Sequence, residues 1–174
     1  MDFQTEYSYQ NPTYAGIKPL ARAISNACLW GNRVGDTVKE KIRVQLHMLN
    51  TSDFFHGIAH KCLGYLDDFS DILHTANLEQ EYPPTEGLAE EIEDLDKAFY
   101  VFTETLKDLK KSLYDFIEYA DNAQLKAMSI AAEDILEDVD EDCGRLITAW
   151  NMWKCEGSAM SFDRWVGTFA KGVD

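Results

Sequence analysis

The sequence lacks a continuous apolar run of about 18 residues, and residues 1–16 lack the positively charged start and apolar stretch of a secretion signal. The first absence excludes a membrane-spanning helix and the second disfavours classical secretion, so we expect a cytoplasmic protein. The four cysteines, Cys28, Cys62, Cys143 and Cys155, stand far apart without a Cys-x-x-Cys pair. They are therefore expected to be reduced thiols, not a disulfide framework or a zinc knuckle.

Basic residues are also scarce. The chain has 16 Lys and Arg against 31 Asp and Glu, a formal net charge of −15, which disfavours nucleic-acid binding. All of the excess charge lies in residues 79–142, which hold 20 acids and 5 bases. This segment is either a solvated helical face or a surface for a basic protein partner.

What the sequence does contain is helical periodicity. Its 174 residues are 45% hydrophobic and 12% aromatic, enough to fill the core of one domain. Apolar residues recur at alternating steps of four and three from Leu88 to Ala120 and again from Leu125 to Trp153. No strand pattern is visible. The sequence predicts an all-α protein, a four-helix bundle with short N- and C-terminal helices.

We expect one domain, residues 1–174, with an extended arm at 1–17, main helices at 36–50, 53–78, 85–120 and 123–154, and a docking helix at 161–171. A further short helix is expected at 19–30, ended by Gly31 and Gly35, and Asp53 is expected to cap the helix that begins there. The connection at 77–96 leaves two topologies open. A helix that begins near Leu88 favours an up-down-up-down bundle, whereas a bent crossover favours a longer connection.

All four histidines lie between positions 47 and 74. On one helix, a set of polar residues falls within about 60°, opposite the apolar seam: Asp53, His56, His60, Asp67, Asp71 and His74. His56 and His60 are one turn apart, the spacing at which two imidazoles chelate one transition metal, and Asp71 with His74 allows the same. The last two main helices contain no histidine, which disfavours a di-iron centre inside one bundle.

The two ends of this polar stripe cannot share a metal within one helix, because His60 and Asp71 are about 16 Å apart along the axis. A second copy running antiparallel across a two-fold axis would bring the histidine end against the carboxylate end, and Gly64 would allow close approach. We therefore expect a homo-oligomer, at least a dimer. The alternative interpretation is that the stripe is only the solvated face of the helix.

These residues resemble a known pattern. Leu46-His47, then Asp53-Phe54-Phe55, then a helix through Gly64-Tyr65-Leu66-Asp67-Asp68-Phe69 is similar to the starvation-type miniferritins (Dps-like proteins) of the ferritin-like superfamily. The resemblance covers positions 44–73. The chain departs from the family in three ways. Thr75 stands where a glutamate is expected, His60 stands where an acid is common, and the joint before the second histidine has a different length.

The resemblance implies a ferritin-like fold and ferroxidase-like iron oxidation and storage in a hollow shell. It also implies ligands shared across a two-fold interface, His47 and His56 or His60 from one subunit and Asp71 from the other. With the stripe, the candidate metal ligands are His47, His56, His60, Asp71 and His74, and the candidate metals are iron, zinc or another transition metal.

A different class of function explains the charge distribution. An acidic interaction protein, such as a phosphate-mimicking inhibitor of a nucleic-acid enzyme of the anti-restriction or anti-CRISPR type, would use residues 79–142 to dock on an arginine-rich groove. This alternative requires a basic protein partner and no metal.

Overall fold

Four long helices form the body of the protein in the computed structural model, which describes residues 1–171. The elements are α1 (Phe3–Glu6), the 3₁₀ helix η1 (Pro12–Gly16), α2 (Ile17–Gln45), α3 (Leu49–His74), α4 (Leu95–Asn122), α5 (Lys126–Cys155) and α6 (Ala159–Phe169). No strand occurs within residues 1–171, so the predicted all-α four-helix bundle is confirmed. Among the described helices, none is long and apolar enough to cross a membrane.

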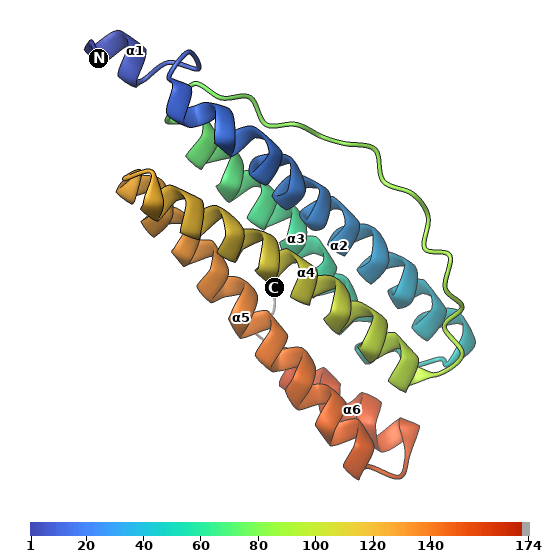
Figure 1. Cartoon of the computed structure of the whole chain (residues 1–174). Coiled ribbons are helices and arrows are strands. Elements are labelled where there is room, and N and C mark those ends of the chain that lie inside the picture. The colour runs from blue at the N-terminus through green and yellow to red at the C-terminus, as the bar shows by residue number, and fades with distance from the viewer. Residues whose placement is uncertain (172–174) are drawn as a thin grey trace.

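The long helices pair as two antiparallel hairpins, α2 with α3 and α4 with α5 (Figure 1). Between the hairpins, residues 75–94 run along the outside of α2 over the length of the bundle, so α3 and α4 point in the same direction. The structure thus has the longer of the two predicted connections. The up-down-up-down alternative is wrong.

The helix predicted at 85–120 begins ten residues later, at Leu95. Pro83, Pro84 and Gly87 lie in the crossover and disfavour helix there. Asp94 then provides the cap, because its carboxylate accepts a hydrogen bond from the Lys97 N–H at 2.8 Å. The apolar residues Leu88 and Ile92, which were assigned to the helix seam, belong to the crossover. Ile92 is buried against the bundle.

The first half of the crossover is held by three polar contacts. The Gln80 amide donates to the Ser25 hydroxyl, Arg22 pairs with Glu81 at 3.5 Å, and the Asn77 amide donates to the Tyr7 carbonyl at 2.9 Å. The hydrogen bond from Asn77 to Tyr7 also attaches the N-terminal arm to the crossover. This arm was predicted to be extended, but it contains α1 and η1.

The helices predicted at 19–30 and 36–50 are one continuous helix, α2. Gly31 and Gly35 are buried in its middle and do not end it. A Cβ atom at Gly35 would lie 2.5 Å from the Ala59 Cβ and 2.8 Å from the Phe102 Cζ. These glycines are therefore packing positions, where α2 comes close to α3 and α4.

The start of α3 is also earlier than predicted, at Leu49 instead of Asp53, after a short turn in which His47 adopts a left-handed backbone conformation with φ 55°. The cap is Asp163 of α6, not Asp53. Its carboxylate accepts bonds from the Thr51 N–H and hydroxyl, both at 2.8 Å, and from the Asn50 N–H at 3.3 Å. This contact attaches α6 to the first turn of α3.

Aromatic rings bind α6 to the rest of the bundle. Phe162 lies edge-on to Trp153 of α5 at 5.3 Å, and Phe169 lies 5.9 Å from Phe54 of α3. Within α6, the Trp165 ring stacks on the Phe169 ring at 4.6 Å. The docking helix predicted at 161–171 thus occurs at 159–169. Its position is set by these rings together with Asp163.

We predict that Gly35→Ala lowers the free energy of unfolding by about 1–3 kcal/mol, because the added methyl overpacks the contact with α3 and α4. The measurement is urea unfolding followed by circular dichroism. Gly144→Ala on α5 is the matched control, since nothing lies within 4 Å of a Cβ there and alanine favours helix. Equal stability of the two variants would show that α2 does not pack this closely.

Candidate functional site

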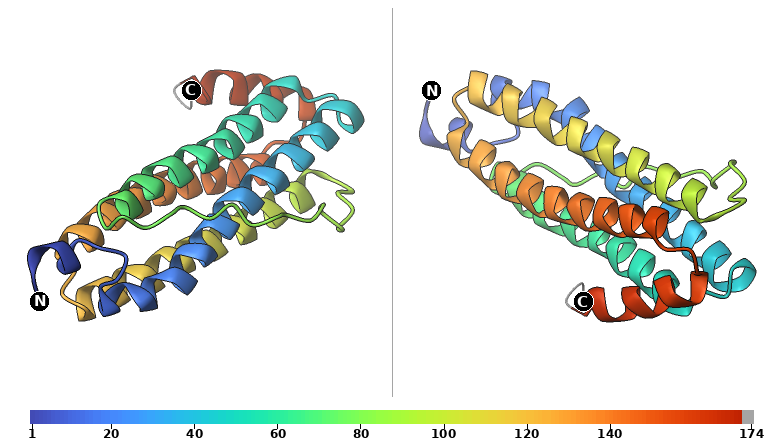
Figure 2. Two further views of the ribbon diagram at one scale, coloured as in Figure 1. Left: turned by 90° about the horizontal axis from the view of Figure 1, so that it is seen from above. Right: turned by 90° about the horizontal axis from the view of Figure 1, so that it is seen from below.

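The predicted polar stripe lies on the outer face of α3. His56, His60, Asp67, Asp71 and His74 are all exposed, whereas Phe55, Ile58, Cys62, Leu66, Phe69 and Leu73 of the same helix are buried. α2 covers one flank of α3 and α6 lies along the N-terminal part of the other (Figure 2). A narrow polar strip therefore remains open between them.

Within the stripe, His56 has a carboxylate on one side of its ring. The Nδ1 atom of His56 lies 2.8 Å from Oδ1 of Asp36 on α2. A carboxylate accepts but does not donate, so the proton of this hydrogen bond belongs to Nδ1. In the neutral ring the lone pair is then on Nε2. This arrangement, a carboxylate holding a histidine tautomer, is the usual outer shell of a histidine that ligates a metal.

His60 stands one turn further along α3, with its ring centroid 6.2 Å from that of His56. Both rings are exposed, and their adjacency confirms the geometry expected for an i, i+4 pair. Two imidazoles at this spacing can hold one transition metal if further ligands come from elsewhere.

The remaining predicted ligands do not join this pair. His47 sits in the turn before α3, about 10 Å or more from His56 along the helix axis. His74 lies at the other end of α3, where its Nε2 is 3.4 Å from the Ser70 hydroxyl. Within residues 1–171, no group of three or more His, Cys, Asp or Glu side chains is placed to hold a metal ion. The five-residue ligand set stays a prediction that needs a second subunit.

The carboxylate end of the stripe carries concentrated negative charge. Burial and then the nearby Asp138, Asp71 and Asp67 raise the pKa of the Asp68 carboxyl above its ordinary value. Carboxylates that repel one another in this way gain from the approach of a cation.

The interior of the bundle has the opposite character. Its centre is filled by apolar side chains and thiols, among them Leu106, Cys28 and Cys62. Burial raises the pKa of the Cys28 thiol to about 12 and that of Cys62 well above its usual value, so both stay protonated and are poor metal ligands. All four cysteines are free, as expected, and Cys155 is exposed.

Asp142 of α5 is the one buried acidic residue in the described chain, and the sequence analysis missed it. Its carboxylate accepts a hydrogen bond from the Lys61 ammonium at 2.9 Å and another from the Tyr65 hydroxyl. Burial raises the pKa of Asp142, and the ammonium opposes this shift. The sequence does indicate that Asp142 is buried, because Val139, Asp142 and Leu146 have the three- and four-residue spacing of one helix face.

Comparison with known proteins bears on the fold. No family model matches this chain, and no curated protein matches it. The structure is similar to the crystal structure of M. penetrans ferritin, with a TM-score of 0.80 and 12% identity over 88% of this chain and 94% of that one. The fold is ferritin-like. At this identity the similarity establishes the architecture alone, and the miniferritin subgroup stays a prediction.

Ferritin-like bundles that bind a di-iron centre hold it with inward-facing carboxylates and histidines. The interior residues of this chain do not fit such a centre. The single buried carboxylate among residues 1–171 already has an ammonium as its counter-ion, and the neighbouring positions are apolar or protonated thiols. Within residues 1–171, histidines and carboxylates are exposed together on the outer face of α3.

We predict that Lys61→Met lowers the free energy of unfolding by about 3 kcal/mol at neutral pH, because it leaves the Asp142 charge buried without a partner. Burial raises the pKa of the Asp142 carboxyl, so the folded state binds the carboxyl proton more tightly than the unfolded state does. The free energy of unfolding therefore falls as the pH rises through the range in which Asp142 ionises. The deficit should therefore shrink as the pH falls towards 4. Denaturant unfolding across pH measures it.

The matched control is the double variant Lys61→Met/Asp142→Asn, which removes the buried charge. It should recover much of the loss at neutral pH and show a weaker pH dependence. A deficit that is the same at every pH would mean that packing, not charge, accounts for the effect of Lys61.

Proposed function

We propose that this chain is a ferritin-like metal-binding protein that holds a transition metal, iron above all, on the outer face of α3 between two subunits. The observation that carries the proposal is the hydrogen bond between Asp36 and His56, which turns Nε2 of an exposed histidine into a ready ligand beside His60. A solvated face has no need of this arrangement, since lysine and glutamate serve there.

In the proposed site, one subunit supplies His56 and His60 and the second subunit supplies Asp71, which the resemblance to the miniferritins also implies. Two nitrogens and one or two carboxylate oxygens suit ferrous iron and zinc. Within one subunit, His47 in the turn before α3 and His74 at the end of α3 lie too far from His56 along the helix axis to complete the same coordination sphere.

The chain's own residues then have defined tasks. Asp36 keeps the proton on Nδ1 of His56, and the acids around Asp68 draw the cation to the surface. Bound ferrous iron would be the substrate of ferroxidase-like oxidation, with the electron passing to dioxygen or a peroxide. Oxidation and storage in a shell extend the proposal from binding to activity.

We predict that the wild-type chain binds Zn²⁺ or Fe²⁺ stoichiometrically and that His56→Gln/His60→Gln abolishes this binding. Asp36→Asn should weaken binding by about 10–100-fold, because the amide no longer fixes the histidine tautomer. Isothermal titration with Zn²⁺ and anaerobic titration with Fe²⁺ measure both effects.

The matched control is His47→Gln, which removes an exposed histidine outside the proposed pair. It should leave the zinc affinity within about twofold of the wild type. Equal zinc binding by the wild type and the His56→Gln/His60→Gln variant would refute the proposed site.

A second candidate function, capture of a basic protein surface, is favoured by one groove at the start of α4. Five acids, Glu90, Glu91, Glu93, Asp94 and Asp96, line it together with Tyr100 and Trp150, and its volume is about 580 Å³. The Lys97 ammonium occupies part of the groove, 2.7 Å from Glu90 and 5.4 Å from the centre of the Tyr100 ring. The groove thus already accommodates an amine between a carboxylate and an aromatic ring.

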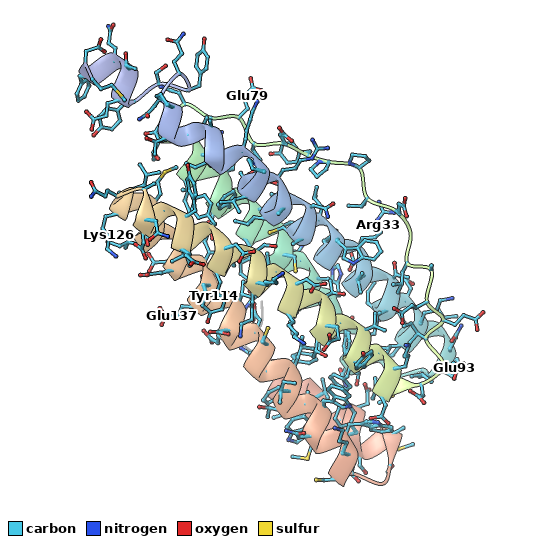
Figure 3. The ribbon with its side chains drawn as sticks, viewed as in Figure 1. Arg33, Glu79, Glu93, Tyr114, Lys126 and Glu137 are labelled. Atoms are coloured by element: carbon cyan, nitrogen blue, oxygen red, sulfur yellow. The ribbon has the colours of Figure 1, made fainter. Side chains whose placement is uncertain are left out.

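Further acids extend this surface along the hairpin, such as Glu137 on the exposed side of α5, which Figure 3 labels together with Glu93.

We predict that an arginine-rich peptide binds the wild type and that binding weakens as salt is raised. Glu90→Lys/Glu91→Lys/Glu93→Lys should weaken binding more than Glu133→Lys/Glu137→Lys/Glu141→Lys, as measured by fluorescence anisotropy. Equal losses would show a diffuse electrostatic field and no groove-specific recognition.

A further inference from the structure

A cavity of about 820 Å³ lies at the end of the bundle where the N-terminal arm approaches the turn between α4 and α5 (Figure 1). Its walls come from the arm, the end of α3, this turn and the start of α5. Small-molecule sites have volumes of about 300–1,000 Å³. The described residues that line the cavity include no member of the polar stripe of α3 or of the acidic groove. A ligand here is therefore separate from the proposed metal and from a basic protein partner.

One side of the lining is apolar. Ile72 of α3, Leu125 in the turn and Met128 of α5 form it, and Ala127 and Ala131 of α5 add to it. Apolar side chains gain from contact with apolar ligand surface, by about 25 cal/mol for each Å² removed from water. A ligand that fits this side carries an aliphatic or aromatic body.

The arm adds a carboxylate and two phenol rings to the lining, those of Glu6, Tyr7 and Tyr14. Burial, and then the nearby Tyr7 and Glu6, raise the pKa of the Tyr14 hydroxyl above its ordinary value, so the three side chains lie close together. No ion pair within residues 1–171 involves Glu6. Aromatic rings and an unpaired carboxylate both attract an organic ammonium group.

The charge balance of the cavity favours a cation over an anion. Lys126 is the one base among the described lining residues, and Figure 3 labels it at the start of α5. Its ammonium lies 3.3 Å from the Asp121 carboxylate, which compensates its charge. Glu6 is left as the uncompensated charge of the lining, in a protein whose formal net charge is −15. The surrounding field thus draws cations and repels anions.

The arm is held in place by the protein's own hydrogen bonds. Asn11 is only 6% exposed, and its carboxamide donates to the Glu6 carbonyl and accepts from the Thr13 N–H, both at 3.0 Å. The Tyr119 hydroxyl donates to the Thr13 carbonyl at 2.6 Å, and the Asn77 amide fixes the arm from the crossover. A wall that is already ordered loses little conformational entropy when a ligand binds.

We propose that this cavity binds a small organic cation, an ammonium group carried on an aromatic or aliphatic body. The ammonium lies beside the Glu6 carboxylate, near the rings of Tyr7 and Tyr14. The body packs against the apolar side around Met128.

Three probes of similar shape test the choice of charge: phenethylammonium, the neutral phenethyl alcohol and the anion phenylacetate. Isothermal titration should show that the ammonium binds about tenfold more tightly than the alcohol, because only the ammonium gains from the carboxylate and the rings. The anion should bind more weakly than the alcohol. Equal binding of the three probes, or no binding of the ammonium, would overturn the proposal.

A charge variant tests the role of the arm. Glu6→Gln should weaken phenethylammonium binding about tenfold and leave the affinity for phenethyl alcohol unchanged. The matched control is Glu118→Gln, which removes an exposed acid of α4 outside the cavity lining. It should leave both affinities within about twofold of the wild type, because salt screens distant exposed charges. Equal losses in the two variants would show a general field effect and refute the role of Glu6.

Filling the cavity tests the location of the ligand. Ala127→Trp adds an indole at an exposed position of the lining and should abolish phenethylammonium binding while the helical circular dichroism stays unchanged. An unchanged affinity would place the ligand elsewhere and refute the proposal.

Zinc titration and light scattering separate this inference from the others. It goes beyond the proposed function, because Ile72 in the cavity wall is about 24 Å from His56 along α3. Ala127→Trp should therefore bind Zn²⁺ as the wild type does, and loss of the metal site leaves the ammonium site intact. A concentration-dependent dimer that Ala127→Trp removes, without ammonium binding, would mean that a second copy occupies the cavity, and the proposal would fail.

Discussion

The pairing of α2 with α3 is the constraint on which the rest of the structure depends. Gly35 lets the two backbones approach, and the contacts between the helices join residues nearly equidistant from the turn at 46–48. Asn32 donates to the Ala59 carbonyl at 3.0 Å, Ser52 to the Lys39 carbonyl at 3.1 Å, and His56 to Asp36 at 2.8 Å. One register therefore determines both how α3 is buried and which of its residues face outward.

The polar contact between α3 and α5 stabilises the fold and does not offer a metal-binding site. Its buried carboxylate, Asp142, is neutralised by the chain's own Lys61 and hydrogen-bonded by Tyr65. Because α6 also packs on α3 near this side, the helix keeps only a narrow strip open to solvent. A fold whose interior can host metal ions has here a closed interior, and the histidines stand outside. Fold and site are separate properties of the chain.

The helices could be predicted from the sequence because their apolar seams are long and regular, and so could the exposed histidine stripe, which needs only the helical repeat. The boundaries could not. The cap of α3 is Asp163, over a hundred residues away, and two glycines that suggested breaks are contacts between helices. Asp36 went unnoticed because its role depends on the register of α2 against α3, and Asp142 because a single acid in an apolar seam gives no indication of its partner.

The long crossover is anchored to the helices mainly near its two ends. Its polar anchors lie at Asn77, Gln80 and Glu81, and its far end is fixed by Ile92 and the cap at Asp94, so the stretch around Pro84 to Gly87 is held mainly from its two ends. Doubling the length of such a loop costs only about 0.6 kcal/mol of closure entropy. Peptides or whole domains inserted at this point would leave the helix registers unchanged, which makes the outer surface of α2 a natural place to display cargo.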